Sequence, residues 1–175
     1  TSLTHLILPG SKITKLNNTG DDNTANLLNL SALTHLDLSN SAELTQITGD
    51  ALPISLTHLT ITGSKITKLN NTGDEGEAKL SDLSALTHLD LSNSENLTQI
   101  SGLPTTLTHL ILPGSQIKIL NNDVQQDHQA KLSDLKALTH LDLSNSKQLN
   151  EITVDALPTT LTHLILPGSQ ITKLN

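Results

Sequence analysis

The chain has 175 residues, of which 37 are leucine, and it contains no Phe, Tyr, Trp, Met, Cys or Arg. Ten lysines against seventeen acidic residues give a formal net charge of −7 at pH 7. The lack of cysteine excludes a disulfide framework, and the acidic balance without aromatic platforms argues against a nucleic-acid partner. No apolar run is long enough to span a bilayer and no signal peptide is visible, so we expect no membrane segment.

A tetrapeptide containing histidine recurs along the whole chain. LTHL occurs seven times, and its copies begin at Leu3, Leu33, Leu56, Leu86, Leu107, Leu138 and Leu161. Long intervals of 30 or 31 residues alternate with short intervals of 21 to 23 residues, so the repeating unit is a pair. Self-similarity at a period of roughly 20 to 50 residues is the signature of a stacked repeat architecture.

The two members of the pair differ after the shared tetrapeptide. The first-type repeat reads LTHLILPGSKITKL at residues 3–16, and the second-type repeat reads LTHLDLSNSAELTQI at residues 33–47. Side chains alternate between the two faces of a strand. Each copy, continued as LTHLxL, therefore predicts a short strand. Its second and third leucines point inward, while the histidine and the residue two positions later point outward.

The connecting segments differ between the two types of repeat. Residues 77–85 and 129–137 have leucines spaced by three among good helix formers, which predicts a short helical turn. The Leu-Pro links at 51–56, 102–107 and 156–161 are predicted to be extended, because proline fixes its own torsion and biases the preceding residue away from helix. A serine follows every strand and predicts a serine ladder, formed by Ser11, Ser41, Ser64, Ser94, Ser115, Ser146 and Ser169.

The frame L-x-x-L-x-L, present in all seven copies, resembles the leucine-rich repeat family. The resemblance covers nearly the whole chain, although serine stands where the family usually has Asn or Cys. It implies an α/β repeat solenoid of about seven repeats, curved, with a parallel β-sheet on the concave face and short helical or extended segments on the convex face.

The linking segments refine this resemblance. The Leu-Pro links look like those of LP-containing bacterial leucine-rich repeats, and the LSDL segments look like the internalin style. This mixture implies a bacterial source and a secreted or translocated protein, whereas the sequence itself leaves localisation open. Such relatives include effector proteins that join the repeats to a catalytic domain.

The chain is predicted to form one domain. Solenoids normally end in repeats with a polar outer face, and neither end of this sequence has one. The opening TSLTHL looks like the tail of a linking segment, and the final ITKLN runs on to ITKLNN in two other copies. We expect residues 1–175 to be a single solenoid, uncapped at both ends, within a longer protein of unknown oligomeric state.

The outward face of the predicted sheet is the candidate binding surface, because solenoids use long concave surfaces to bind proteins. One column of this face contains His5, His35, His58, His88, His109, His140 and His163. The next column contains Ile7, Asp37, Thr60, Asp90, Ile111, Asp142 and Ile165. We predict a non-catalytic module that binds a protein partner here or on adjoining loops, although the Trp, Tyr and Arg of typical interface hot spots are absent.

The histidine column allows other interpretations. Histidines on adjacent strands could share a zinc ion, with Asp37, Asp90 or Asp142 as an oxygen ligand, and they titrate near pH 6. A ladder offers flat pairs of ligands, so we predict no bound metal or other cofactor. Duplication of a solvated position along with its repeat explains the column without any role.

Two weaker alternatives concern other polar rows. The threonine that precedes each histidine recurs regularly, as in ice-binding surfaces, but the uneven repeat lengths argue against a flat lattice. Acidic residues gather in the loops after three first-type repeats and could hold calcium: Asp21, Asp22, Asp74, Glu75, Glu77, Asp123 and Asp127. They lack a dense D-x-D-x-D spacing within any one loop, so solubility is the simpler explanation.

Enzymatic activity is not predicted. The sequence has no cysteine nucleophile, no G-x-S-x-G elbow and no glycine-rich phosphate loop after a strand. Seven equivalent pairs of serine and histidine indicate a structural role, because an active site needs one asymmetric constellation.

Overall fold

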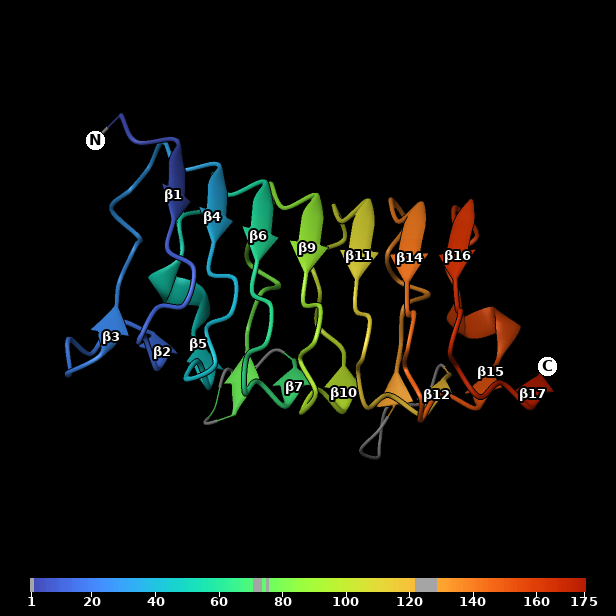
Figure 1. Cartoon of the computed structure of the whole chain (residues 1–175). Coiled ribbons are helices and arrows are strands. Elements are labelled where there is room, and N and C mark those ends of the chain that lie inside the picture. The colour runs from blue at the N-terminus through green and yellow to red at the C-terminus, as the bar shows by residue number, and fades with distance from the viewer. Residues whose placement is uncertain (1, 71–73, 75, 122–128) are drawn as a thin grey trace.

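A computed structural model of the chain describes residues 2–70, 74, 76–121 and 129–175. The chain coils into a parallel β-solenoid in which every LTHL copy begins one strand of a seven-stranded sheet (Figure 1). These strands are β1 (His5–Ile7), β4 (His35–Asp37), β6 (His58–Thr60), β9 (His88–Asp90), β11 (His109–Ile111), β14 (His140–Asp142) and β16 (His163–Ile165). All neighbours pair in parallel with histidine opposite histidine and leucine opposite leucine.

A second parallel sheet of ten two-residue strands closes the other side of each coil. Its strands are β2 (Lys15–Leu16), β3 (Thr24–Ala25), β5 (Gln46–Ile47), β7 (Lys68–Leu69), β8 (Glu77–Ala78), β10 (Gln99–Ile100), β12 (Ile119–Leu120), β13 (Gln129–Ala130), β15 (Glu151–Ile152) and β17 (Lys173–Leu174). Three first-type repeats contribute two strands each, and the later strand folds back toward the preceding repeat, as in the order β15-β12-β13-β10. The ten-stranded sheet therefore extends past both ends of the seven-stranded one (Figure 1).

The prediction of helical turns at residues 77–85 and 129–137 was wrong. Both segments begin as strands, β8 and β13, and continue as consecutive tight turns. In the first, the Leu83 amide donates to the Leu80 carbonyl at 3.1 Å and the Leu86 amide to the Leu83 carbonyl at 2.9 Å. Successive turns bury leucines spaced by three as well as a helix does. Pairing of β8 and β13 with strands of adjacent coils supplies hydrogen bonds that a helix would otherwise make within itself.

The helical elements among the described residues are two short 3-10 turns, η1 (Gly49–Ala51) and η2 (Val154–Ala156). They end at Ala51 and Ala156, the first residues of two of the Leu-Pro links. Leu52 and Leu157, which precede the prolines, have extended backbones with ψ of 142° and 144°, as predicted. The prediction was wrong beyond the prolines, where each link closes a tight turn: the Leu56 amide donates to the Pro53 carbonyl and the Leu161 amide to the Pro158 carbonyl, both at 3.1 Å.

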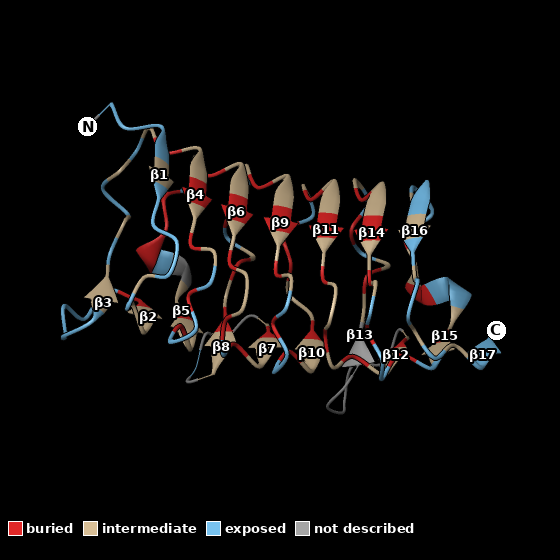
Figure 2. Cartoon of the chain, viewed as in Figure 1, coloured by how far each residue is buried: buried red, intermediate tan, exposed pale blue. Residues whose placement is uncertain are grey.

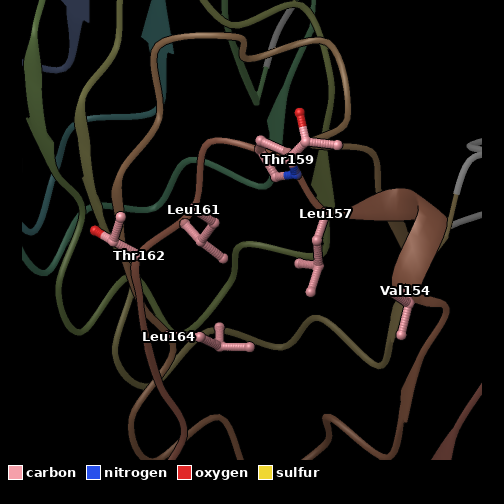
Figure 3. A pocket seen from close by; sticks show the side chains of 7 residues that line it. Val154, Leu157, Thr159, Leu161, Thr162 and Leu164 are labelled. Carbon is pink, nitrogen blue, oxygen red and sulfur yellow. The ribbon is translucent and has the colours of Figure 1, made fainter.

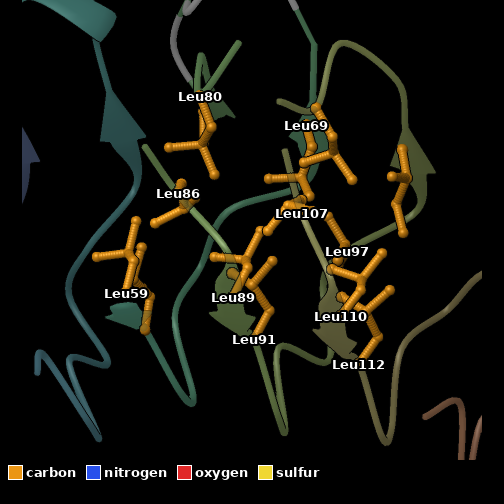
Figure 4. Packing of buried hydrophobic residues seen from close by; sticks show 14 of the residues in the cluster. Leu59, Leu69, Leu80, Leu86, Leu89, Leu91, Leu97, Leu107, Leu110 and Leu112 are labelled. Atoms are coloured by element: carbon orange, nitrogen blue, oxygen red, sulfur yellow. The ribbon is translucent and has the colours of Figure 1, made fainter. Parts of the chain in front are cut away.

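Columns of aliphatic side chains fill the space between the two sheets. Leu86, Leu89 and Leu91 of one repeat are at most 1% exposed, and they pack beside the equivalent leucines of the next repeat (Figure 4). Burying a leucine contributes roughly 1.5–3 kcal/mol relative to exposure, so this layered core supplies the main stabilisation. Figure 2 shows the inward positions of the interior strands buried and the end strands β1 and β16 more exposed. The predicted inward orientation of the leucines is confirmed.

A tight turn follows each strand of the seven-stranded sheet, and it explains one difference between the repeat types. First-type repeats place glycine at a left-handed position, such as Gly114 with φ of 80°, and second-type repeats place asparagine there, such as Asn93 with φ of 58°. The serine after this residue is the predicted ladder position, and the ladder is confirmed as hydroxyl pairs. These are Ser11 with Ser41 at 3.0 Å, Ser64 with Ser94 at 3.3 Å and Ser115 with Ser146 at 3.1 Å.

Candidate functional site

The seven histidines of the strands form one continuous stack. Ring centroids of neighbours lie 4.2–4.3 Å apart, and neighbouring ring planes differ by 9–11°. The stack follows from the parallel in-register pairing, which places the same side chain at the same height on every strand. We call this stack the histidine ladder, and we call the surface made by the two predicted columns the ladder face. The structure brings all fourteen predicted site residues together on this face.

The threonine before each histidine orients the imidazole ring. In β9, Thr87 Oγ1 donates to the Thr57 carbonyl at 3.2 Å and lies 2.9 Å from Nδ1 of His88. A hydroxyl has one proton and a carbonyl cannot donate, so when the Thr87 hydroxyl donates to the carbonyl, His88 Nδ1 carries a proton and donates it to the threonine. The same pair of contacts recurs on six strands, from Thr34 to Thr162, and Thr4 contacts His5 in the same way.

This arrangement fixes the chemical character of the ladder. When Nδ1 carries the proton, Nε2 of the neutral ring has a free lone pair. Protonation of the ring adds a proton at Nε2 and leaves the contact with threonine in place. The ladder is thus a row of hydrogen-bond acceptors when neutral and a row of charged donors when protonated.

Three ladder histidines have pKa values below the usual value of about 6.5. Burial is the larger cause for His58 and His88, followed by repulsion from neighbouring histidines, among which are His35 and His109. The pKa of His140 is lowered by the same two causes, with His163 as its first repelling neighbour. At any given pH these three rings therefore carry less positive charge than free histidines do.

The second column of the ladder face alternates between acid and uncharged residues. Asp90 Oδ1 accepts hydrogen bonds from the Ser92 amide at 2.8 Å and from the Ser92 hydroxyl at 2.5 Å. The equivalent contacts hold Asp37 to Ser39 and Asp142 to Ser144. Each aspartate thus closes the turn after its strand, a structural role that the sequence analysis did not anticipate.

The uncharged members of this column are exposed to different degrees. Ile7 is 64% exposed and Ile165 is 42% exposed, whereas Thr60 and Ile111 are half-buried. The register places each aspartate between two uncharged neighbours, as in the pairing of Asp90 with Thr60 and with Ile111. The ladder face therefore combines apolar contact area with separated carboxylates.

Two shallow depressions lie on the ladder face. One, of about 190 Å³, lies over His58, His88, Asp90 and Ile111. The other, of about 260 Å³, lies over the equivalent positions from β1 to β6. Both are smaller than the roughly 300–1,000 Å³ of typical small-molecule pockets. Their shape favours contact with an extended partner over enclosure of a compact ligand.

A further cavity of about 340 Å³ lies at the β16 end of the solenoid (Figure 3). Its walls are mainly apolar and include Val154, Leu157, Leu161 and Leu164. Leu161 and Leu164 correspond by repeat position to Leu107 and Leu110, which are fully buried in the interior. The cavity is thus the end face of the leucine core, and it has no converging polar groups of the kind found in a catalytic site.

The geometry bears on the other sequence-based alternatives. Among the described residues, no three His, Cys, Asp or Glu side chains are grouped to hold a metal ion. Nearly parallel rings direct their Nε2 lone pairs side by side instead of toward one point, whereas zinc requires converging ligands. The ladder threonines use their hydroxyls inside the protein, which weakens the case for ice binding.

The acidic loops are only partly described. Asp21 Oδ2 accepts the Thr19 hydroxyl at 2.6 Å, and Glu77 Oε2 accepts the Asp74 amide at 3.1 Å. Glu75, Asp123 and Asp127 lie outside the described residues. Within the described part of the chain, no helix has the length and apolar character needed to cross a membrane.

The chain was also compared with known proteins. No protein-family model matches it, and no curated protein matches it.

Proposed function

We propose that this chain is a non-catalytic module that binds a protein partner through the ladder face. The observation that carries the proposal is the continuity of this face, on which fourteen residues form two unbroken columns across seven paired strands. The backbone hydrogen bonds of the sheet and the leucine core beneath it make the surface preorganised, which reduces the entropic cost of binding.

The chemistry of the face suits a polypeptide. Exposed Ile7 and Ile165 offer apolar contacts, the ladder offers hydrogen-bonding groups at regular spacing, and the depressions are shallow. The absence of tryptophan, tyrosine and arginine means that the partner supplies the large anchoring side chains.

We further propose that the chain is a leucine-rich repeat protein of the bacterial type, serving as the recognition region of an effector or surface protein. The L-x-x-L-x-L frame, the Leu-Pro links and the leucine core support this assignment. The ten-stranded second sheet is its most distinctive departure from a leucine-rich repeat with convex helices.

A second candidate function is a pH-responsive surface. It is favoured by one observation, the stacking of seven imidazoles with ring centroids 4.2–4.3 Å apart. Charging adjacent rings at this separation is unfavourable, so each added proton opposes the next, and the face changes its character when the solution is acidified.

Selection of a displayed random peptide library at pH 7.5 tests the main proposal. Selected peptides should lose at least about tenfold in affinity for a Thr60→Lys/Ile111→Lys variant, because two lysines then lie at the centre of the face. Neither substitution removes a side-chain hydrogen bond among the described residues. Ile54→Lys/Val154→Lys is the matched control, since both isoleucine and valine are exposed apolar residues outside the face. Equal loss in both variants would move the binding site elsewhere.

A further inference from the structure

The charge of the ladder face reverses sign when its histidines are protonated. With neutral histidines, the ionisable groups of the two columns are Asp37, Asp90 and Asp142, which give a charge of −3. Seven protonated rings change this to +7 − 3 = +4. The residue before each histidine is threonine, and the residue two positions beyond the second column is Pro, Ser or Thr, so neither adds a charged side chain beside the ladder.

The protonated ladder is a preorganised row of donors. Each Nδ1 is already engaged by the preceding threonine, so the proton added at Nε2 is the one that can meet a partner. In the described part of the chain, no protein group accepts a hydrogen bond from these Nε2 atoms. Six gaps of 4.2–4.3 Å give a row about 25 Å long. This length matches about eight residues of extended polypeptide at roughly 3.3 Å per residue.

Repulsion within the row creates a demand for anions. Protonation places like charges on rings that stack at the separations given above, and these charges repel each other. Carboxylates at the Nε2 edge offset this repulsion and form charge-assisted hydrogen bonds. Anion binding and protonation of the ladder therefore favour each other.

The second column indicates which kind of polyanion fits. Ile7, Ile111 and Ile165 lie beside the ladder and offer apolar contacts that a polypeptide can use through its own apolar side chains. Single-stranded nucleic acids bind through stacking of bases on exposed aromatic faces, but the faces of the interior imidazoles are covered by their neighbours. The surface therefore favours a peptide over a nucleic acid.

We infer that the ladder face binds an extended acidic polypeptide segment in mildly acidic solution and releases it near neutral pH. This inference rests on the proposed function, because it specifies the chemistry of the protein partner.

The probe is a fluorescently labelled dodecapeptide that repeats Glu-Glu-Val four times, with a Gln-Gln-Val peptide as its uncharged control. Fluorescence anisotropy should show binding of the acidic peptide at pH 5.5, weaker by at least about tenfold at pH 7.5, and weakened further by salt. The uncharged peptide should not bind at either pH. Equal affinity of the acidic peptide at both pH values, or no binding at pH 5.5, would overturn the inference.

Variants of three central ladder positions separate charge from shape. His58→Gln/His88→Gln/His109→Gln should reduce binding at pH 5.5 by about tenfold, because three of the seven cations are lost. His58→Lys/His88→Lys/His109→Lys should bind the peptide at pH 7.5 as well, because lysine stays charged. His128→Gln, which alters a histidine outside the LTHL copies, should bind as the parent does. A lysine variant that is folded by circular dichroism and does not bind at pH 7.5 would contradict the inference.

Other occupants give distinct results. Tighter binding of heparin or single-stranded DNA than of the acidic peptide at pH 5.5 would show that the face does not select a polypeptide. Dimerisation at pH 5.5 that displaces the peptide, measured by light scattering, would assign the face to a second copy of the chain.

The inference and the proposed function fail in different ways. If library-selected peptides bind at pH 7.5 through Thr60 and Ile111 while the glutamate peptide does not bind at pH 5.5, the proposed function stands and the inference falls. If selected peptides bind the Thr60→Lys/Ile111→Lys variant as well as they bind the parent, the proposed function falls, and the inference that rests on it falls too.

Discussion

Nδ1 of His88 lies 2.9 Å from the hydroxyl oxygen of Thr87, whose own proton is donated to the Thr57 carbonyl at 3.2 Å. The threonine thus links its histidine to the backbone of the preceding strand. This relationship explains why Thr and His recur together in the LTHL copies, since the hydroxyl orients the ring that the stack then repeats. Because the same threonine contact recurs in every repeat, it favours the same tautomer for all the ladder histidines.

The first prediction concerns this threonine. Thr87→Val has nearly the same shape but removes both hydrogen bonds, so we expect a loss of about 1 kcal/mol in the free energy of unfolding measured with urea. Nitrogen-15 NMR should show His88 protonated at Nδ1 in the parent and a mixture of tautomers in the variant. Thr87→Ser keeps the hydroxyl and should keep the Nδ1 tautomer. Identical His88 spectra for the valine and serine variants would contradict the role of the hydroxyl.

The second prediction is a loss of stability on acidification. The pKa values of His58, His88 and His140 are lower in the folded chain than in the unfolded chain, where they are about 6.5. Between these values the unfolded state binds more protons, so the free energy of unfolding falls as pH decreases. Above about pH 7.5 both states are neutral, and the full stability is present.

Urea midpoints at pH 7.5, 6.5 and 5.5 measure this loss. The His58→Gln/His88→Gln/His140→Gln variant should lose less between pH 7.5 and pH 5.5 than the parent does, and His128→Gln is the single-site comparison. A parent that is more stable at pH 5.5 than at pH 7.5 would show that the ladder histidines gain favourable partners on protonation.

The third prediction concerns the turn after β9. Asn93 has φ of 58°, a left-handed conformation that costs most residues roughly 1–2 kcal/mol. Asn93→Ala should therefore lower the free energy of unfolding by about 1 kcal/mol, whereas Asn93→Gly should be close to neutral. Thermal or urea unfolding of the two variants gives the comparison. An alanine variant as stable as the glycine variant would exclude backbone strain as the reason for asparagine at this position.

The fourth prediction compares equivalent core positions. Leu110 is fully buried in the interior, whereas Leu164 is only partly buried in the end strand β16. Leu110→Ala should cost about 2–5 kcal/mol, because it removes buried surface and leaves a cavity. Leu164→Ala should cost clearly less in the same urea titration. A larger cost at Leu164 would mean that the end of the stack is better covered than its exposure indicates.

Part of the fold followed from the repeat pattern. The intervals of LTHL predicted stacked repeats, and the resemblance of the L-x-x-L-x-L frame to leucine-rich repeats implied a parallel sheet. The alternation of side chains predicted the buried leucines and the outward column of histidines, because the period of a strand fixes which side chains share a face. The helical turns at 77–85 and 129–137 were predicted wrongly, because leucines spaced by three are compatible with either a helix or successive turns. The outcome depends on the strands of neighbouring coils that pair with β8 and β13. The local sequence does not specify these strands.

The candidate site was predictable in position but not in chemistry. The sequence placed Asp90 on the outer face but did not reveal that its Oδ1 is held by Ser92. The D-x-S spacing was the available signal, because an aspartate commonly bonds the backbone two residues later in a turn. The direction of the hydrogen bond between threonine and histidine required the coordinates, because it depends on the carbonyl of the neighbouring strand.

The central claim is that a polypeptide binds on the ladder face, and the histidine ring protons report on it most directly. Seven of the eight histidines lie on this face, and His128 lies outside the LTHL copies. Proton NMR of the chain at pH 7.5, titrated with a library-selected peptide, should shift the ring signals of interior histidines such as His58, His88 and His109 and leave His128 unchanged. Saturable binding that leaves every ladder signal in place would contradict the claim.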